Sequence, residues 1–345
     1  MKGVIGKKNG HLNMDTHLSY EFVIWMQLGK TMQKVLTTLA VLFVISVTLG
    51  FPAHSQRLTF MTGPAGGTWY PLGGAVKQLL EQEIEGLKIV IRPGAGLINI
   101  KGIATGKAQL AWGNVISTVD AIHGRPPFKT KITGLCNIAA FYYQFAQIPV
   151  TDLSIKSVAD FRGKALATLP RGNTTEVATR DILSIYNLTY DDLGKINFAS
   201  LSDQVNMMKD GQIDGFIVAS SVPAAGILDL ATARPIKLLP IPDVEFQRLK
   251  QKNPGWSRAV IPSGTYTGQD QDIPTASFQM HMLANCGHVS EELAYEITSA
   301  LAKRGAELSA VTAMLTDYDL SIMSKDVGVP MHPGAARFYR EQGIE

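Results

Sequence analysis

The sequence RLTFMTGPAGGTWYPLGGAVKQLLEQE, residues 57–83, places a glycine-rich loop between a strand and a helix. We expect a strand at 57–61, followed by the glycine loop at 63–67. Leu72, Val76, Leu79 and Leu80 recur at helical spacing and predict a helix over 70–83. A strand that runs through a glycine loop into a helix is the repeating unit of an α/β sheet.

The same unit recurs along the chain. Ser157 with Asp160 three residues later has the pattern of a helix N-cap. We expect further strands at 88–92, 109–112, 164–169, 196–198 and 213–219, and helices at 97–105, 174–186 and 203–209. The order predicts two α/β blocks, each with a parallel sheet.

Two long strand-like segments do not fit the repeating unit. Residues 137–150 and 275–285 carry no intervening helix, and a helical tail begins at Ser290. The chain would pass between the blocks through these two segments, which predicts a hinge with a cleft between two lobes. We therefore expect an α/β protein of two lobes with two long hinge crossovers, in which 56–146 with 280–345 form lobe I and 147–279 form lobe II.

The N-terminal region predicts export. An uncharged run of 17 residues at 35–51 follows Lys34 and precedes Ala53-His54-Ser55, where small residues stand at positions −3 and −1 of a cleavage site. The run is shorter than the roughly 20 residues of a membrane span, so a cleaved signal peptide at 32–55 fits better than an uncleaved anchor. Residues 1–31 are then an extension or a misassigned start, Met1 and Met32 both remaining open as the true start.

Charge and cysteine content exclude several classes of protein. Residues 1–55 hold five Lys against one Asp and one Glu, so the remaining chain carries 27 basic and 27 acidic side chains. This balance argues against nucleic-acid binding. The two cysteines, Cys136 and Cys286, rule out a disulfide-stapled scaffold. Their apolar surroundings favour buried free thiols, while an oxidising compartment would allow a disulfide.

Common catalytic motifs are missing from the sequence. The loop at 63–68 has no Lys before Thr68 and is therefore not a nucleotide P-loop, and Gly94-Ala95-Gly96 lacks the third glycine of a dinucleotide fingerprint. The sequence holds no HExxH, CxxC or GxSxG motif. The histidines of the exported part are widely spaced, at His123, His281, His288 and His332. We expect neither catalysis nor a metal or cofactor.

Three glycine loops that lead into helices remain as candidate binding elements, at 66–70, 93–96 and 171–176. The first turn of a helix exposes unpaired N–H groups and partial positive charge, so such ends bind carboxylates and phosphates. Arg92 and Arg171 could clamp a carboxylate in a bidentate manner. The alternative for the third loop is structural, because Asn173 and Glu176 have the spacing of a capping box.

Several longer stretches resemble one family. They are GPAGGTWYPLGGAV (63–76), GLINIKGIATGKAQLAWGN (96–114), DFRGKALATLPRGNTTEVATRDIL (160–183), MKDGQIDGFIVASSVPAAGILDL (208–230) and VPMHPGAARFYREQG (329–343). In this order they are similar to the TAXI solute receptors, the extracytoplasmic binding proteins of tripartite ATP-independent periplasmic (TRAP) transporters. The central loop departs from the GSGTE of many relatives, since it reads RGNTTE from Arg171.

The resemblance implies a two-lobed, type II-like periplasmic-binding-protein fold. It also implies a periplasmic receptor, monomeric and without catalysis, that closes on a small organic anion such as a carboxylate or an amino acid like glutamate. The receptor would deliver this ligand to a TRAP-type membrane permease. A sensor that reports to a membrane signalling protein and an enzyme on the same fold are the alternatives. The residues expected to contact the ligand are Gly67, Thr68, Trp69, Tyr70, Arg92, Gly96, Asn114, Arg171, Asn173, Thr174, Thr175 and Ser220. We expect Thr174 and Thr175 to matter more for affinity than for folding.

Overall fold

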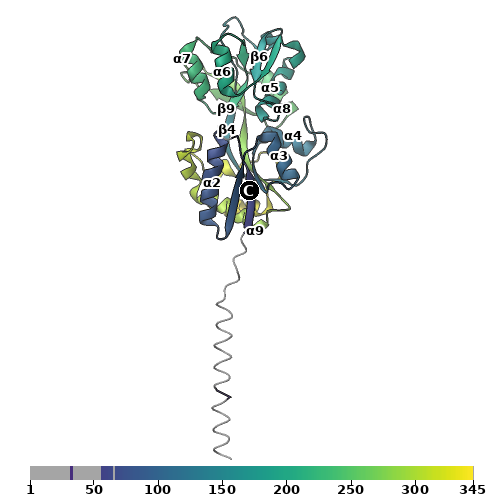
Figure 1. The fold of residues 1–345 in the computed structure, drawn as a ribbon, viewed down its shortest axis with the longest axis vertical. Helices are drawn as coiled ribbons and strands as arrows, with labels where there is room; N and C mark the ends of the chain where they lie inside the picture. The colour runs from purple at the N-terminus through teal and green to yellow at the C-terminus, as the bar shows by residue number, and fades with distance from the viewer. Residues whose placement is uncertain (1–31, 34–55, 65–66, 345) are drawn as a thin grey trace, which may run out of the picture. The chain divides into compact units, whose positions relative to one another are not determined.

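The structure is a computed structural model that describes residues 32–33, 56–64 and 67–344 (Figure 1). The residues from Ser55 to Glu345 form one compact unit. The expected extension at 1–31 and the signal peptide, except Met32 and Gln33, lie outside the described residues. In the described part of the chain, no helix has the length and apolar character needed to cross a bilayer.

The first lobe is built on a seven-stranded sheet. Its strands follow the order β2-β1-β3-β12-β4-β9, and β11 pairs with β12. β1 is parallel to β2 and β3, whereas β12 is antiparallel to β3, β4 and β11, and β4 is antiparallel to β9. The strands are β1 (Gln56–Met61), β2 (Leu87–Arg92), β3 (Leu110–Asn114), β4 (Leu135–Gln147), β9 (Val218–Ser220), β11 (Ser257–Ile261) and β12 (Ile273–Asn285).

The second lobe is built on a five-stranded sheet with the order β10-β5-β8-β6-β7. β6 is parallel to β7 and β8, while β5 is antiparallel to β8 and β10. Its strands are β5 (Pro149–Val150), β6 (Ala165–Thr168), β7 (Lys195–Phe198), β8 (Gly215–Phe216) and β10 (Lys237–Leu238). The expected purely parallel sheets are therefore mixed, because the long connecting strands run against the βαβ strands.

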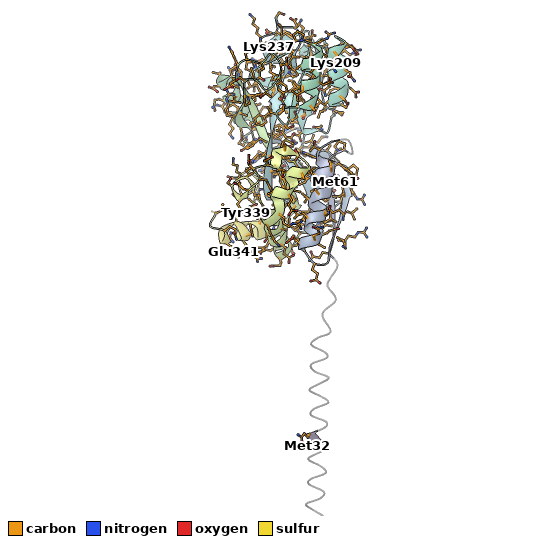
Figure 2. All side chains as sticks on the ribbon, turned by 90° about the vertical axis from the view of Figure 1, so that its left-hand side faces the viewer. Met32, Met61, Lys209, Lys237, Tyr339 and Glu341 are labelled. Carbon is orange, nitrogen blue, oxygen red and sulfur yellow. A yellow bond between two sulfur atoms is a disulfide. The ribbon has the colours of Figure 1, made fainter. Side chains whose placement is uncertain are left out.

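Helices cover both sheets, and Figure 1 shows α2, α3, α4 and α9 beside the first and α5 to α8 beside the second. Figure 2 places Met61, Tyr339 and Glu341 in the first lobe and Lys209 and Lys237 in the second. The α-helices are α2 (Trp69–Glu83), α3 (Gly96–Ala104), α4 (Val115–His123), α5 (Thr174–Ile185), α6 (Leu201–Lys209), α7 (Ala225–Ala233), α8 (Asp243–Lys252), α9 (Glu291–Arg304), α10 (Leu320–Met323) and α11 (Pro333–Glu341). The short 3-10 helices are η1 (Val158–Phe161), η2 (Tyr190–Asp192), η3 (Gly305–Ala310) and η4 (Ala313–Leu315).

The segments that join the lobes are strands that change sheet. β4 ends at Gln147 in the first sheet and β5 begins at Pro149 in the second, with buried Ile148 between them. The strand expected at 213–219 likewise divides at Ile217 into β8 and β9, which belong to different sheets, whereas the expected crossover at 275–285 lies wholly in β12 of the first sheet. The residue boundaries expected for the two lobes stay predictions.

Apolar packing holds each lobe together. In the first lobe, Trp112 of β3 is fully buried and makes edge-on contacts with Phe60 and Phe141, each at 4.8 Å between ring centroids. A further core cluster contains residues from both sheets, and in it Trp256 and the β12 residue Phe278 are fully buried with ring centroids 5.2 Å apart. Burial of such large side chains supplies most of the driving force for folding.

Cys136 and Cys286 form a disulfide, so the favoured expectation of free thiols is wrong. Cys136 lies in β4 and pairs in register with Ala284 near the end of β12, which brings Cys286 within 5.5 Å, Cα to Cα. The sequence could not show this proximity because 150 residues separate the two cysteines.

Candidate functional site

A cavity of about 240 Å³ lies at the carboxyl ends of strands from both sheets; we call it the site cavity. Loops that follow β1, β2, β3, β6 and β9 contribute to it, as expected for a ligand site in an α/β fold. The described residues that line it are Pro64, Gly67, Thr68, Trp69, Ala95, Gly96, Asn114, Tyr142, Gln144, Leu169, Asn173, Thr175, Ala219, Ser220, Ser221 and Met314.

Four helices begin at the wall of the site cavity. Their N-cap residues all line it, namely Thr68 for α2, Ala95 for α3, Asn114 for α4 and Asn173 for α5. The first three helices belong to the first lobe and α5 belongs to the second. Each helix start carries partial positive charge and N–H groups that have no partner within the helix. The site cavity is therefore surrounded by hydrogen-bond donors from both lobes.

The third glycine loop, at 171–176, caps α5 through Asn173 but does not form the capping box that its spacing allowed. The side chain of Asn173 accepts a hydrogen bond of 3.0 Å from the backbone N–H of Thr175 and so caps α5. Glu176 does not complete a capping box, because its carboxylate accepts two hydrogen bonds from Arg180 at 3.0 and 3.1 Å and one from Tyr190 at 3.1 Å. The cap by Asn173 is confirmed, and the expected role of Glu176 in a capping box is wrong.

An amide pair forms one side of the site cavity. Gln144 of β4 donates a hydrogen bond of 3.0 Å to the side-chain oxygen of Asn114, and both residues are buried. Each amide has one donor and one acceptor group, so the pair leaves one N–H₂ group and one carbonyl oxygen for the cavity. Tyr142 lies two residues from Gln144 on the same face of β4. Burial raises the pKa of Tyr142, and the neighbouring Trp69 side chain lowers it in part, so this hydroxyl stays protonated at neutral pH.

A buried network holds the wall at Ser220 and Ser221. The side-chain amide of Gln147 donates to the Ser220 hydroxyl at 2.9 Å and to the Ser221 carbonyl at 2.8 Å. Its carbonyl accepts from the hydroxyl of Tyr266, which in turn accepts a bond of 2.7 Å from the backbone N–H of Ala224. Burial raises the pKa of Tyr266 to about 12, so this hydroxyl remains a donor.

The start of α3 is held by one buried side chain. Asn99 donates hydrogen bonds of 2.8 Å to the backbone carbonyls of Thr62 and Trp112, at the ends of β1 and β3. The carbonyl oxygen of the same amide reaches so close to Gly94 that a Cβ there would lie 1.9 Å away. Only glycine allows this approach, which fixes the loop before Ala95. Trp112 adds a bond of 3.1 Å from its indole to the carbonyl of Trp69 at the start of α2.

The structure brings most of the predicted ligand contacts together. Eight of the twelve line the site cavity among the described residues: Gly67, Thr68, Trp69, Gly96, Asn114, Asn173, Thr175 and Ser220. Their role in ligand binding stays a prediction. The other four, Tyr70, Arg92, Arg171 and Thr174, are not part of the lining.

Both arginines of the expected carboxylate clamp lie outside the cavity lining. Arg92 is exposed at the end of β2. The guanidinium of Arg171 lies over the ring of Phe198, 5.1 Å from its centroid, and lines a separate groove of about 330 Å³ that also contains Lys101, Glu176 and Arg180. The charge of a loop residue does not reveal which way its side chain points.

The hydroxyl of Thr174 faces the first lobe. It accepts a hydrogen bond of 3.0 Å from Ser117 of α4, and a Cβ added to Gly96 would lie 2.1 Å from its oxygen. The hydroxyl of Thr175 has no partner among the described residues, and Thr175 lines the site cavity. The two neighbouring threonines therefore have different surroundings.

Sequence reasoning missed half of the cavity lining. The missed residues are Pro64, Ala95, Tyr142, Gln144, Leu169, Ala219, Ser221 and Met314. Alternation along β4 could have placed Tyr142 and Gln144 on one face. Met314 comes from η4, far along the chain, and carries no local signal. Among the described residues, no group of three or more His, Cys, Asp or Glu is placed to hold a metal ion.

Comparison with solved structures shows the fold. The chain is similar to PhnD1 from Prochlorococcus marinus in complex with methylphosphonate, with a TM-score of 0.55 and 11 % identity over 84 % of this chain and 100 % of that one. It also matches a periplasmic sulfonate-binding protein SsuA from Methylobacillus flagellatus (TM-score 0.48, 14 % identity, 85 % and 96 % covered). A TctC solute-binding protein from Polaromonas matches too (TM-score 0.47, 18 % identity, 85 % and 97 % covered). The expected two-lobed periplasmic-binding-protein fold is confirmed.

The sequence also matches a family profile along most of its length. The match runs from residue 60 to 343 and includes every residue that lines the site cavity. It is coarser than the TAXI resemblance, which stays a prediction. The chain belongs to the NMT1-like family.

Proposed function

We propose that this protein is an extracytoplasmic receptor that captures a small organic anion in the site cavity and delivers it to a membrane permease. The observation that carries the proposal is the meeting of four helix N-termini at one cavity, with N-caps Thr68, Ala95, Asn114 and Asn173. Their partial positive charges add at the cavity and favour a negative group there. The hydroxyls of Thr68 and Thr175 supply further donors.

The fold and its lobes support a receptor that closes around its ligand. The similar PhnD1 structure contains methylphosphonate, which is itself a small anion. In the present chain, Ser117 and Thr174 join α4 to α5 beside the cavity, and the backbone N–H of Leu97 donates to the carbonyl of Gly172 at 3.3 Å. A ligand that contacts both lobes would favour this closed arrangement by its differential affinity.

Export and the type of transporter complete the proposal. The leader pattern at 32–55 predicts secretion, and the Cys136–Cys286 disulfide is the kind of bond that persists in an oxidising compartment. The motifs at 63–76 and 160–183 resemble those of TRAP receptors, so we propose a TRAP-type permease as partner. The receptor itself performs no catalytic step.

A ligand screen tests this function. The exported form, residues 56–345, is heated in the presence of organic acids, amino acids, sugars and metal cations, and each compound that raises the melting temperature is titrated by calorimetry. We expect only anions to bind tightly. Tight binding of a neutral sugar or a cation, with no anion bound, would overturn the proposal.

A further inference from the structure

The lining of the site cavity has no charged side chain. Among the described lining residues there is no Lys, Arg, His, Asp or Glu. Ala65 and Gly66, which stand between Pro64 and Gly67 in the sequence, carry no charge either. Any net charge on a bound ligand must therefore be balanced by neutral hydrogen-bond donors, neutral acceptors and helix dipoles.

The nearest acidic side chain in the sequence of the loop is already paired. Glu176 is 3 % exposed and engages Arg180 and Tyr190, and it lines the separate groove rather than the site cavity. A ligand ammonium group in the site cavity would find no carboxylate to pair with. It would also lie near four helix N-termini, whose partial positive charges repel a positive ammonium group.

A second negative charge would have no cationic side chain in the lining to pair with and only the helix starts to balance it. Arg92 and Arg171, the cations nearest to the glycine loops in sequence, are not part of the cavity lining. The remainder of the wall is apolar, with Leu169, Ala219 and Met314. The cavity volume of about 240 Å³ is below the roughly 300–1,000 Å³ of pockets that hold drug-sized ligands. The cavity therefore suits a ligand that has one anionic group and a short, uncharged remainder.

We infer that the ligand is a monoanion without an ammonium group, that is, a monocarboxylic acid such as a hydroxy acid or oxo acid, and neither an amino acid nor a dicarboxylate. This inference rests on the proposed receptor function and narrows its ligand class. The amide pair of Asn114 and Gln144, with one donor and one acceptor free, suits a hydroxyl or oxo group near the carboxylate.

Matched sets of compounds test the inference. One set is lactate, alanine, lactamide and malate; a longer set is 2-hydroxyisocaproate, leucine and 2-hydroxyisocaproamide. Calorimetric titration of residues 56–345 is expected to show binding of the hydroxy acid in at least one set. The amino acid of the same set should bind about 100-fold or more weakly, because its ammonium group has no partner in the cavity. An amino acid or malate that binds as tightly as the hydroxy acid would overturn the inference and leave the receptor function intact. If no anion of these sets or of the wider screen binds, the proposed function fails, and the inference fails with it.

A charge variant gives an independent readout. Asn173→Asp keeps an N-cap of equal quality but adds a carboxylate at the cavity wall. We expect this variant to bind the hydroxy acid roughly tenfold or more weakly, because the new carboxylate repels the anion. The difference in affinity between the hydroxy acid and the amino acid should also become smaller, because the carboxylate can pair with the ammonium group of the amino acid. Asn187→Asp is the control, since this exposed residue follows the opposite end of α5. Equal affinities in wild type, Asn173→Asp and Asn187→Asp would contradict the inference.

Discussion

The hydroxyl of Ser117 in α4 donates a hydrogen bond of 3.0 Å to the hydroxyl of Thr174 in α5, and thereby joins the two lobes beside the site cavity. Ser117 is fully buried and Thr174 is 1 % exposed. Gly96 packs against the same threonine, because a Cβ at this position would lie 2.1 Å from its hydroxyl oxygen. This contact between α4 and α5 therefore depends on the small residue Gly96 and on the hydroxyls of Ser117 and Thr174.

The Gly96→Ala variant should separate closure from folding. The added methyl group cannot fit while Thr174 stays in place, so the lobes must open to accept it. Overpacking of this kind costs about 1–3 kcal/mol, which corresponds to roughly 5- to 150-fold weaker ligand binding. Gly74→Ala is the matched control, since no atom lies within 4 Å of the added Cβ. Calorimetry of both variants with the acid found in the screen checks this; equal affinities would show that the Gly96 contact has no part in closure.

Thr174 and Thr175 should have different roles. Thr175→Val removes a hydroxyl that lines the cavity and is expected to weaken anion binding by about 1.5–3 kcal/mol, with a small change in the urea midpoint. Thr174→Val leaves the buried Ser117 hydroxyl without its acceptor, so it should lower the stability of the closed form. Titration and urea unfolding of each single variant distinguish the two effects. A lower midpoint with unchanged affinity for Thr175→Val would remove Thr175 from the site.

Tyr266→Phe should act on the cavity from a distance. It removes the hydroxyl that links Ala224 to Gln147, whose amide holds Ser220 and Ser221. We expect a loss of stability of about 1–3 kcal/mol for the unpaired buried groups, together with weaker binding. Tyr295→Phe, whose hydroxyl bonds exposed Glu341, is the control and should leave affinity unchanged. If Tyr266→Phe lowers only stability, the network is structural and does not position the cavity wall.

Acid should destabilise the protein through His281. Complete burial lowers the pKa of this imidazole to about 3, where it contacts Thr118 at 2.9 Å and Asn137 at 3.1 Å. Between that value and the unfolded pKa of about 6.5, the unfolded chain binds more protons than the folded protein. The free energy of unfolding therefore decreases as the pH is lowered, by up to about 1.4 kcal/mol per pH unit. Burial and the nearby Asp181 raise the pKa of Asp120 to about 6, which gives a slope of opposite sign below that pH.

The comparison that isolates His281 is therefore wild type against His281→Gln. Urea unfolding at several pH values between 7 and 4 should show that the variant, which cannot take up the proton, loses less stability on acidification. Parallel curves for the two proteins would mean that His281 does not titrate in this range.

The disulfide should contribute to stability and not to binding. The bond links Cys136 to Cys286, which are 150 residues apart in the sequence. The Cys136→Ser/Cys286→Ser double variant is expected to lose about 2–5 kcal/mol of unfolding free energy. Neither cysteine lines the site cavity, so the affinity for the acid should not change. Identical denaturation curves with and without reductant would contradict the assignment of a stabilising bond.

Local patterns made much of the fold predictable from the sequence. The strand at β1, the glycine loop after it and α2 follow from composition and helical spacing. The helix α4 was not foreseen, because VISTVDAIH is rich in β-branched residues that disfavour a helix. Its helical form depends on tertiary burial of Val115, Ile116 and Val119.

The site was predictable where a helix begins and not where distant segments meet. Thr68 and Asn173 were found because both stand in glycine loops that lead into helices, and Asn173 also has the spacing of an N-cap. Gln144 and Met314 reach the cavity only through the packing of β4 and η4. Alternation along β4 predicts the face of the strand on which Gln144 lies, but not that this face meets the cavity. The clamp expected from Arg171 was not found in the cavity lining, because the side chain lies over Phe198 instead.

The most direct test of the account is a crystal structure of residues 56–345 with the acid that the screen identifies. We predict that its carboxylate oxygens lie within about 3.2 Å of backbone N–H groups at the starts of α2 and α5, with the Thr175 hydroxyl as a further donor. A ligand bound instead in the groove beside Lys101 and Arg171, with the site cavity left to solvent, would contradict the central claim.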